Sequence, residues 1–307
     1  MKTLAKFAAL AAVSMIALNA THASAEETIT EFRIGILGGE NEADRLRSNE
    51  CLVKRYEALL GVPVKLFPAA DYAGTIEGLK GGNLDYAELG ASGYAALYLE
   101  DENLVEPLAT TEQTDGSTGY HSVLITLADS NIDNLDEMKG KVLGYADPNS
   151  TSGYLIPYVS FKKQGIDPDA YFAKTVFSGG HEQNVLAVLN HDVDAGVTWA
   201  SGVGEWEEGY SSGNLRKMVD KGMLDMSQVR EIWKSPLIPN GPTVVRSSLP
   251  QGVKDKLKAS LLSFNQDDPE CMYKVAAGEI NRYVEVQPSF YEPIFDARRA
   301  TIEAKKN

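Results

Sequence analysis

The 307-residue chain is poor in cysteine, in histidine and in basic residues. Its two cysteines and four histidines show none of the spacings of zinc sites or of Cys-x-x-Cys redox pairs, and no H-E-x-x-H motif occurs. We therefore expect no metal and no cofactor. Twenty-nine Lys and Arg against 43 Asp and Glu give a formal net charge of −14, which argues against nucleic acid or an anionic membrane surface as a partner.

Long hydrophobic runs are also scarce. The apolar stretch at residues 7–18 is too short to span a bilayer. Two lysines precede it and Ala-Ser-Ala at residues 23–25 follows it, which is the pattern of a secretory signal peptide with its cleavage site. We expect residues 1–25 to be removed and the mature chain to be periplasmic.

The two cysteines, Cys51 and Cys271, lie near opposite ends of the mature chain. In an oxidising compartment they either form a disulfide or remain two buried thiols, and the sequence supplies no distance that would decide. A bridge would tie an N-terminal helix to a C-terminal one.

Strand and helix patterns alternate along the chain. Residues 31–38 read as a buried strand, and residues 43–60 as a helix that ends at a glycine. Continued β-α-β alternation predicts parallel strands with helices on both faces. We expect an α/β protein of two lobes, each a mostly parallel sheet flanked by helices, with lobe 1 formed by residues 26–118 plus 241–307 and lobe 2 by the inserted residues 119–240. Two crossing strands would form a hinge that lets the lobes close on a ligand.

The segment ADPNSTSGYLIP, residues 146–157, carries consecutive hydroxyls on Ser150, Thr151 and Ser152. They follow a turn and begin an apolar helical run, so one interpretation is a simple helix cap. The other is an anion site, because free amides at a helix start point outward at the positive end of the helix dipole. Neutral N–H and O–H donors would bind an oxyanion without any Lys or Arg.

A second helix start lies at SGGHEQN, where His181 follows two glycines. An imidazole N–H at this position would donate to an oxyanion. The alternative is an ordinary surface or core histidine.

GYHSVLI, ADPNSTSGYLIP, GGHEQNVLAV and IWKSPLIP, with DYAGTIEGL upstream, resemble the phosphonate-binding components of periplasmic ABC importers. The resemblance covers residues 32–250. It implies a type II periplasmic binding protein, in which two lobes close about a hinge, and a membrane permease and an ATPase as partners. We expect a monomer.

The resemblance also implies the binding residues. Hydroxyls and amides of the STS segment and the imidazole would hold the phosphonate oxygens, and two tyrosines would line the site or merely pack beside it. Trp199 would close the pocket with an apolar wall, or belong to the core. The residues concerned are Ser150, Thr151, Ser152, His181, Tyr72, Tyr120 and Trp199.

One departure from the family pattern concerns the ligand. Members that bind aminoethylphosphonate hold its ammonium with two carboxylates, and this chain has Gly202 and Gly241 at those places. Glu205 would take the place of the first carboxylate only if the loop is aligned in a different register. Because an ammonium desolvated without a carboxylate is unfavourable, we expect phosphate, phosphite or a short alkylphosphonate as ligand, and we expect Asp at 241 to favour aminoethylphosphonate. Aminoethylphosphonate itself, or a sulfonate such as taurine, remains the alternative.

An enzyme is the rival class, with Ser150 as nucleophile and His181 as base. STSG is not the G-x-S-x-G nucleophile elbow, and no third member of a triad is evident. A Ser-based hydrolase is therefore the less favoured hypothesis, and we expect a binding protein rather than an enzyme.

Overall fold

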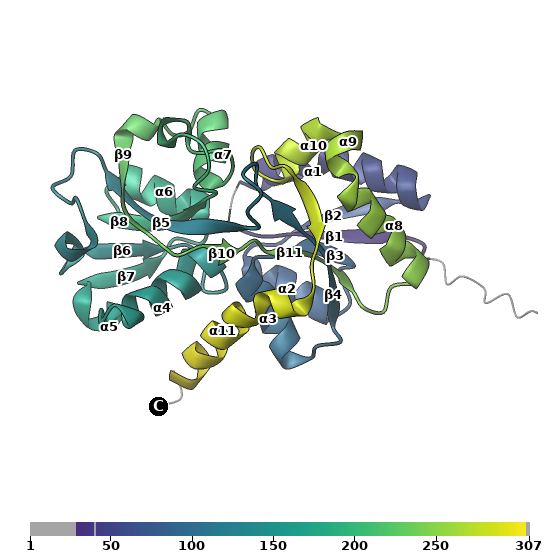
Figure 1. Ribbon diagram of the computed structural model, residues 1–307, viewed down its shortest axis with the longest axis horizontal. Helices are drawn as coiled ribbons and strands as arrows, with labels where there is room; N and C mark the ends of the chain where they lie inside the picture. Colours follow the sequence, from purple (N-terminus) through teal and green to yellow (C-terminus); the bar gives the residue numbers. More distant parts are fainter. Residues whose placement is uncertain (1–28, 40, 305–307) are drawn as a thin grey trace, which may run out of the picture.

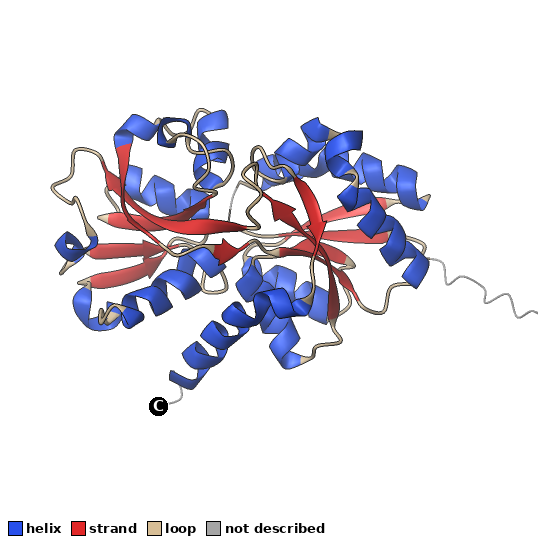
Figure 2. Ribbon diagram, in the orientation of Figure 1, coloured by secondary structure: helices blue, strands red, loops and turns tan. Residues whose placement is uncertain are grey.

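The computed structural model describes residues 29–39 and 41–304, so the expected signal peptide lies outside the described residues. Two lobes lie side by side and are joined by extended segments in the middle of the molecule (Figure 1). Each lobe is a sheet with helices on both faces (Figure 2). The expected two-lobed α/β architecture is confirmed. In the described part of the chain, no helix is long and apolar enough to cross a membrane.

Lobe 1 is built on a six-stranded sheet in the order β12-β4-β11-β3-β1-β2. Helices α1, α8, α9 and α10 cover one face, and α2, α3 and α11 cover the other (Figure 1). The strands are β1 (Phe32–Ile36), β2 (Val64–Pro68), β3 (Tyr86–Glu88), β4 (Val105–Glu112), β11 (Pro242–Arg246) and β12 (Arg282–Glu285). The helices are α1 (Glu42–Leu60), α2 (Tyr72–Lys80), α3 (Ala91–Glu100), α8 (Gln251–Leu262), α9 (Phe264–Asp267), α10 (Pro269–Val275) and α11 (Glu292–Ala304).

Lobe 2 is built on a sheet in the order β10-β5-β8-β6-β7, and β9 also pairs with β5. Its strands are β5 (Gly119–Leu127), β6 (Val142–Tyr145), β7 (Lys174–Phe177), β8 (Ala195–Ala200), β9 (Val229–Lys234) and β10 (Ile238–Pro239). Its helices are α4 (Ile156–Lys163), α5 (Pro168–Tyr171), α6 (His181–Leu189) and α7 (Asn214–Asp220). The described residues also include short 3₁₀ turns, at Leu135–Met138, Trp206–Glu208, Met226–Gln228 and Pro288–Tyr291.

The sheets are mixed rather than mostly parallel, which corrects one part of the expectation. In lobe 1, β1 pairs in parallel with β2 and β3, whereas β11 and β12 run antiparallel to their neighbours. In lobe 2, β6 is parallel to β7 and β8, but β5 is antiparallel to β8, β9 and β10. Hydrophobic periodicity reports burial and not strand direction, so the pattern could not show that the strands next to the crossings run antiparallel to their neighbours.

Local capping residues place the helices that surround the site. Asn41 caps α1, because its Oδ1 accepts from the N–H of Asp44 at 3.2 Å. Gly61 ends α1 with φ of 70°, a left-handed conformation that suits glycine. Asp71 caps α2 by accepting from the N–H of Gly74 at 2.8 Å. These caps put the starts of α1 and α2 just after the C-terminal ends of β1 and β2. These strand ends face lobe 2.

Two crossings join the lobes. The chain leaves the first sheet after β4 and enters the second at β5, and it returns between β10 and β11. The expected lobe boundaries at 118/119 and 240/241 lie in these two connections. Thr110 Oγ1 donates to the carbonyl oxygen of Asn240 at 3.0 Å, and Asn240 Nδ2 donates to that of Thr111 at 2.8 Å. The outgoing and returning segments are therefore tied to each other where they cross.

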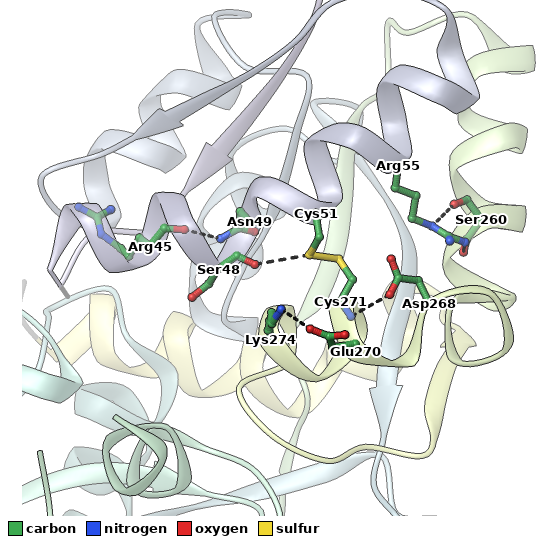
Figure 3. Close-up of a disulfide and its surroundings, with 10 residues drawn as sticks. All are labelled: Arg45, Ser48, Asn49, Cys51, Arg55, Ser260, Asp268, Glu270, Cys271 and Lys274. Atoms are coloured by element: carbon green, nitrogen blue, oxygen red, sulfur yellow. Dashed lines mark hydrogen bonds and ion pairs between the residues drawn. A yellow bond between two sulfur atoms is a disulfide. The ribbon is translucent and has the colours of Figure 1, made fainter. Parts of the chain in front are cut away.

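A disulfide joins Cys51 of α1 to Cys271 of α10, with their Cα atoms 5.8 Å apart (Figure 3). The sequence left this pairing open. Both helices belong to lobe 1 and pack against each other. The bridge therefore stabilises one lobe and does not restrict the movement of one lobe relative to the other.

Candidate functional site

A cavity of about 270 Å³ lies between the lobes and is lined from both sides. All the binding residues expected from the sequence line it: Tyr72, Tyr120, Ser150, Thr151, Ser152, His181 and Trp199. Glu205 is exposed and is not part of the lining. The structure thus brings together residues that lie more than 100 positions apart in the sequence, from Tyr72 to Trp199.

The hydroxyl cradle, residues 150–152, sits at the start of a helix. Residues Thr151–Leu155 form one π-helical turn that leads into α4, and Ser150 caps it by accepting from the N–H of Gly153 at 2.9 Å. Ser150, Thr151 and Ser152 expose only 2%, 1% and 2% of their surface. Their burial keeps bulk water from competing for the hydroxyl donors, and the helix start adds its positive dipole.

His181 faces this cradle from the start of α6. Its Nε2 lies 3.1 Å from Ser150 Oγ, and the residue is 6% exposed. Gly153 makes the approach possible, since a Cβ there would lie 3.0 Å from His181 Cε1 and 2.5 Å from the Cβ of Ala146. The starts of two lobe 2 helices therefore converge on one point, as the anion-site interpretation requires.

Tyr120 and Trp199 form an aromatic wall on the neighbouring strands β5 and β8. Their ring centroids are 5.6 Å apart and their planes are nearly perpendicular, at 83°. Burial raises the pKa of the Tyr120 hydroxyl, and interactions with Ser152 and Thr151 offset part of this effect. Tyr120 is consequently a neutral hydroxyl at physiological pH, placed beside the cradle.

Tyr72 is the first residue of α2 and approaches the cavity from lobe 1. Its backbone N–H donates to Asp147 Oδ2 of lobe 2 at 3.3 Å. Asp147 is 3% exposed, and its other oxygen accepts from the N–H of Asn149 at 2.7 Å. Burial raises the pKa of Asp147, and these two backbone donors lower it in part. Asp147 therefore shapes the turn before the cradle and connects it to the opposite lobe.

Further contacts between the lobes surround the cradle. The N–H of Ser92, in the first turn of α3, donates to Thr151 Oγ1 at 2.9 Å. Arg298 of α11 donates to Ser92 Oγ at 3.0 Å and to Asn149 Oδ1 at 3.4 Å. Sequence reasoning missed Asp147 and Arg298, because nothing local indicates that α11 reaches the cradle.

Two glycine loops meet directly across the cleft. A Cβ on Gly180 would lie 2.0 Å from the carbonyl oxygen of Gly39, and a Cβ on Gly39 would lie 2.8 Å from that of Gly179. Backbone of lobe 1 therefore touches backbone of lobe 2 beside His181. Together with the hydrogen bonds around the cradle, this contact defines a closed arrangement of the lobes.

Neither glycine at the expected amine positions has room for a carboxylate. A Cβ on Gly241 would lie 1.8 Å from the carbonyl oxygen of Leu89. Gly202 has φ of 72°, and its Cβ would lie 2.7 Å from His121 Cδ2. The expectation that Asp at 241 favours an amine ligand is therefore contradicted, since the backbone carbonyl of Leu89, the residue after β3, occupies the space.

Within the described residues, no group of three or more His, Cys, Asp and Glu side chains is arranged to hold a metal ion. At the cradle, the described residues offer an anion neutral hydroxyls, the His181 imidazole and the dipoles of helix starts, while Arg45, Lys217 and Lys274 line other parts of the cavity. This donor set suits a small, multiply charged oxyanion.

Comparisons with other proteins agree with this geometry. The family model described as "ABC transporter, phosphonate, periplasmic substrate-binding protein" matches residues 34–291. The phosphonates-binding periplasmic protein of Escherichia coli K12 is 34% identical over 270 residues, covering 86% of this chain and 75% of the relative. The phosphate-import protein PhnD of Mycolicibacterium smegmatis is 32% identical over 254 residues, covering 78% of this chain and 75% of the relative.

Solved structures show the same fold. The binding-protein component of a Pseudomonas aeruginosa ABC phosphonate transporter superposes with a TM-score of 0.75 at 30% identity, covering 89% of this chain and 88% of the other. PhnD1 of Prochlorococcus marinus, solved with methylphosphonate, superposes with a TM-score of 0.72 at 20% identity, covering 89% and 98%. This chain belongs to the family of periplasmic substrate-binding proteins of ABC phosphonate transporters and has their type II fold.

Proposed function

We propose that the protein is the substrate-binding component of an ABC importer and captures a small phosphorus oxyanion (a phosphonate, phosphite or phosphate) between its lobes. The observation that supports this most strongly is the convergence of the 150–152 hydroxyls and His181 in one cavity between the lobes. The chain has a net charge of −14. Such a site therefore binds an anion through neutral donors and helix dipoles, and not through the electrostatic field of the protein's net charge.

Capture proceeds in two steps. The anion first docks on the cradle, which belongs entirely to lobe 2 and does not depend on closure. The lobes then close about the crossings, so that the start of α3 and the Gly38-Gly39 loop come across the cleft. Closure is favoured by contacts that exist only in the closed state. We propose that residues 26–118 with 241–307, and residues 119–240, move as the two units.

The remaining roles follow from capture. The chain acts in the periplasm as a monomer without a cofactor, and its closed form docks on a membrane permease that is driven by an ATPase. The site binds rather than catalyses, because Ser150 is held as a helix cap and three adjacent hydroxyls suit a cradle better than a nucleophile.

A ligand panel tests the proposal. Isothermal titration of the mature protein with phosphate, phosphite, methylphosphonate, aminoethylphosphonate and taurine is expected to give binding of phosphorus compounds and the weakest binding for taurine. If taurine binds more tightly than every phosphorus compound, the protein is a sulfonate receptor instead. Turnover of a phosphate ester would support the hydrolase alternative.

A cradle variant tests the site itself. Thr151→Ala removes a hydroxyl from a charged acceptor in a buried site, which is expected to weaken binding by roughly 1–3 kcal/mol. Thr175→Ala in β7, which lies outside the cavity, is the matched control and is expected to bind like the unmodified protein. Equal affinities for both variants would remove Thr151 from the site.

A further inference from the structure

Helix α11 reaches from lobe 1 toward the cradle. It packs along α3 of lobe 1 and also contacts α4 of lobe 2, the helix that continues the cradle (Figure 1). The Phe295 ring of α11 stacks on the Tyr98 ring of α3 with centroids 4.6 Å apart, and Ile294 and Phe295 are fully buried. Arg298 follows these two residues at the spacing of one helical turn, so it lies on the same inner face of α11.

The Arg298 guanidinium contacts both lobes. It donates to Ser92 Oγ of lobe 1 at 3.0 Å and to Asn149 Oδ1 of lobe 2 at 3.4 Å. Both partners adjoin the cradle: the Ser92 N–H donates to Thr151 Oγ1 at 2.9 Å, and Asn149 immediately precedes Ser150. Because Thr151 Oγ1 accepts from Ser92, its own O–H can donate to a bound anion. Arg298 therefore holds, from lobe 1, the residues that orient the cradle.

The charge of Arg298 differs in its surroundings from that of the next residue. Arg299 is exposed and forms an ion pair with Asp296 at 2.9 Å. Arg298 is half-buried, and no carboxylate within residues 29–39 and 41–304 forms an ion pair with it. Burial lowers the pKa of its guanidinium, which nevertheless stays protonated at physiological pH. Lobe 1 therefore holds a positive charge without an acidic partner in the described chain, next to a cradle whose hydroxyls are neutral.

A bound anion changes the interaction between the two lobes at this point. With the cradle empty, the contact of Arg298 with lobe 2 is one hydrogen bond to a neutral amide, at 3.4 Å. A phosphonate in the cradle brings about one to two negative charges to lobe 2, opposite the positive charge of lobe 1. Attraction between partly buried charges is screened less by salt than attraction between surface charges. The loaded lobe is therefore drawn toward Arg298 more strongly than the empty one.

We propose that Arg298 is a positioning residue that couples anion binding to closure of the lobes. Through Ser92 and Asn149 it orders the cradle from the opposite lobe, and its charge attracts lobe 2 once lobe 2 carries the anion. Closure is thus favoured by the charge of the ligand itself, which an empty cradle lacks. This inference rests on the proposed function.

Isothermal titration with methylphosphonate, together with small-angle X-ray scattering, tests the inference. Arg298→Gln keeps a polar side chain but removes the charge, and it is expected to bind at least about tenfold more weakly and to compact less at saturating ligand. Arg299→Gln makes the same change in net charge on the same helix, so it is the matched control and is expected to behave like the unmodified protein. Equal affinities of the two variants would overturn the role of Arg298 alone. If the unmodified protein binds neither methylphosphonate nor phosphate, the proposed function fails and this inference with it.

A conservative variant separates the charge of Arg298 from a merely structural role and covers the case in which Arg298→Gln does not fold. Arg298→Lys keeps the positive charge but not the planar fork of donors, so its affinity for methylphosphonate is expected to stay within about threefold of that of the unmodified protein. If Arg298 only packed α11 against α3, lysine and glutamine would weaken binding alike. A loss of about tenfold or more in Arg298→Lys would therefore contradict coupling through the charge.

Discussion

Closure of the lobes is most directly tested at Gly180. Its φ of 179° is extended backbone that any residue adopts, so alanine is compatible with lobe 2 taken alone. In the closed arrangement, however, the new Cβ would lie 2.0 Å from the carbonyl oxygen and 2.3 Å from the Cα of Gly39 in lobe 1. Gly180→Ala therefore blocks closure while leaving the cradle intact.

The size of the effect follows from the distances. Ordinary contact begins at 3.4 Å, so the lobes must separate locally by about 1.4 Å, the difference between 3.4 and 2.0 Å. Such a shift takes the bond from Ser92 to Thr151, now 2.9 Å, and the bond from Tyr72 to Asp147, now 3.3 Å, out of hydrogen-bonding range. At about 0.5–1.5 kcal/mol each, their loss weakens ligand binding by roughly 1–3 kcal/mol, or about 5- to 150-fold.

Isothermal titration with methylphosphonate measures the affinity, and small-angle X-ray scattering with and without the ligand measures compaction. Gly93→Ala in α3 is the control, because its Cβ would meet only Ile76 and Leu89 of the same lobe, at 3.6 Å or more. Gly180→Ala is expected to bind weakly and to stay extended, whereas Gly93→Ala behaves like the unmodified protein. Normal affinity with normal compaction in Gly180→Ala would refute closure through this contact.

Two further predictions concern stability. The disulfide closes a loop with a sequence separation of 220, so replacing Cys51 and Cys271 with serine is expected to lower the free energy of unfolding by about 2–5 kcal/mol; urea denaturation with an unchanged midpoint would contradict this. Glu88, with its pKa raised from 4.5 to about 7, supports folding fully below pH 4.5 and loses this contribution as pH rises through 7. The free energy of unfolding of Glu88→Gln relative to the unmodified protein is therefore expected to rise by roughly 2–3 kcal/mol between pH 5 and pH 8, and a difference independent of pH would show that Glu88 titrates normally.

Helix and strand positions were predictable wherever local signals set them. The helix expected at 43–60 is observed at Glu42–Leu60, because Asn41 and Gly61 cap it through contacts with their immediate neighbours. The strand expected at 31–38 is observed at Phe32–Ile36. Strand direction was not predictable for β5 and β11, since it depends on how the chain crosses between the lobes.

The contacts that close the site carried no local signal. Arg298 lies 149 positions from Asn149 and 206 from Ser92, and only the packing of α11 brings it to the cradle. The space beside Gly241 is filled by the carbonyl of Leu89, which no pattern around residue 241 indicates. Non-local contacts of this kind are properties of the packed lobes.

By itself, the sequence determined an acidic two-lobed binding protein with neutral hydroxyl donors at one helix start and a histidine at another, because caps, turns and charge are local or compositional. Only the tertiary structure decided that the two helix starts meet at 3.1 Å, between Ser150 Oγ and His181 Nε2. It alone also placed Glu88 in the wall of the same cavity, where Tyr283 and Tyr86 hydrogen-bond to it. The physical reason is that a site between two lobes is formed by burial and distance across sheets, which sequence spacing does not encode.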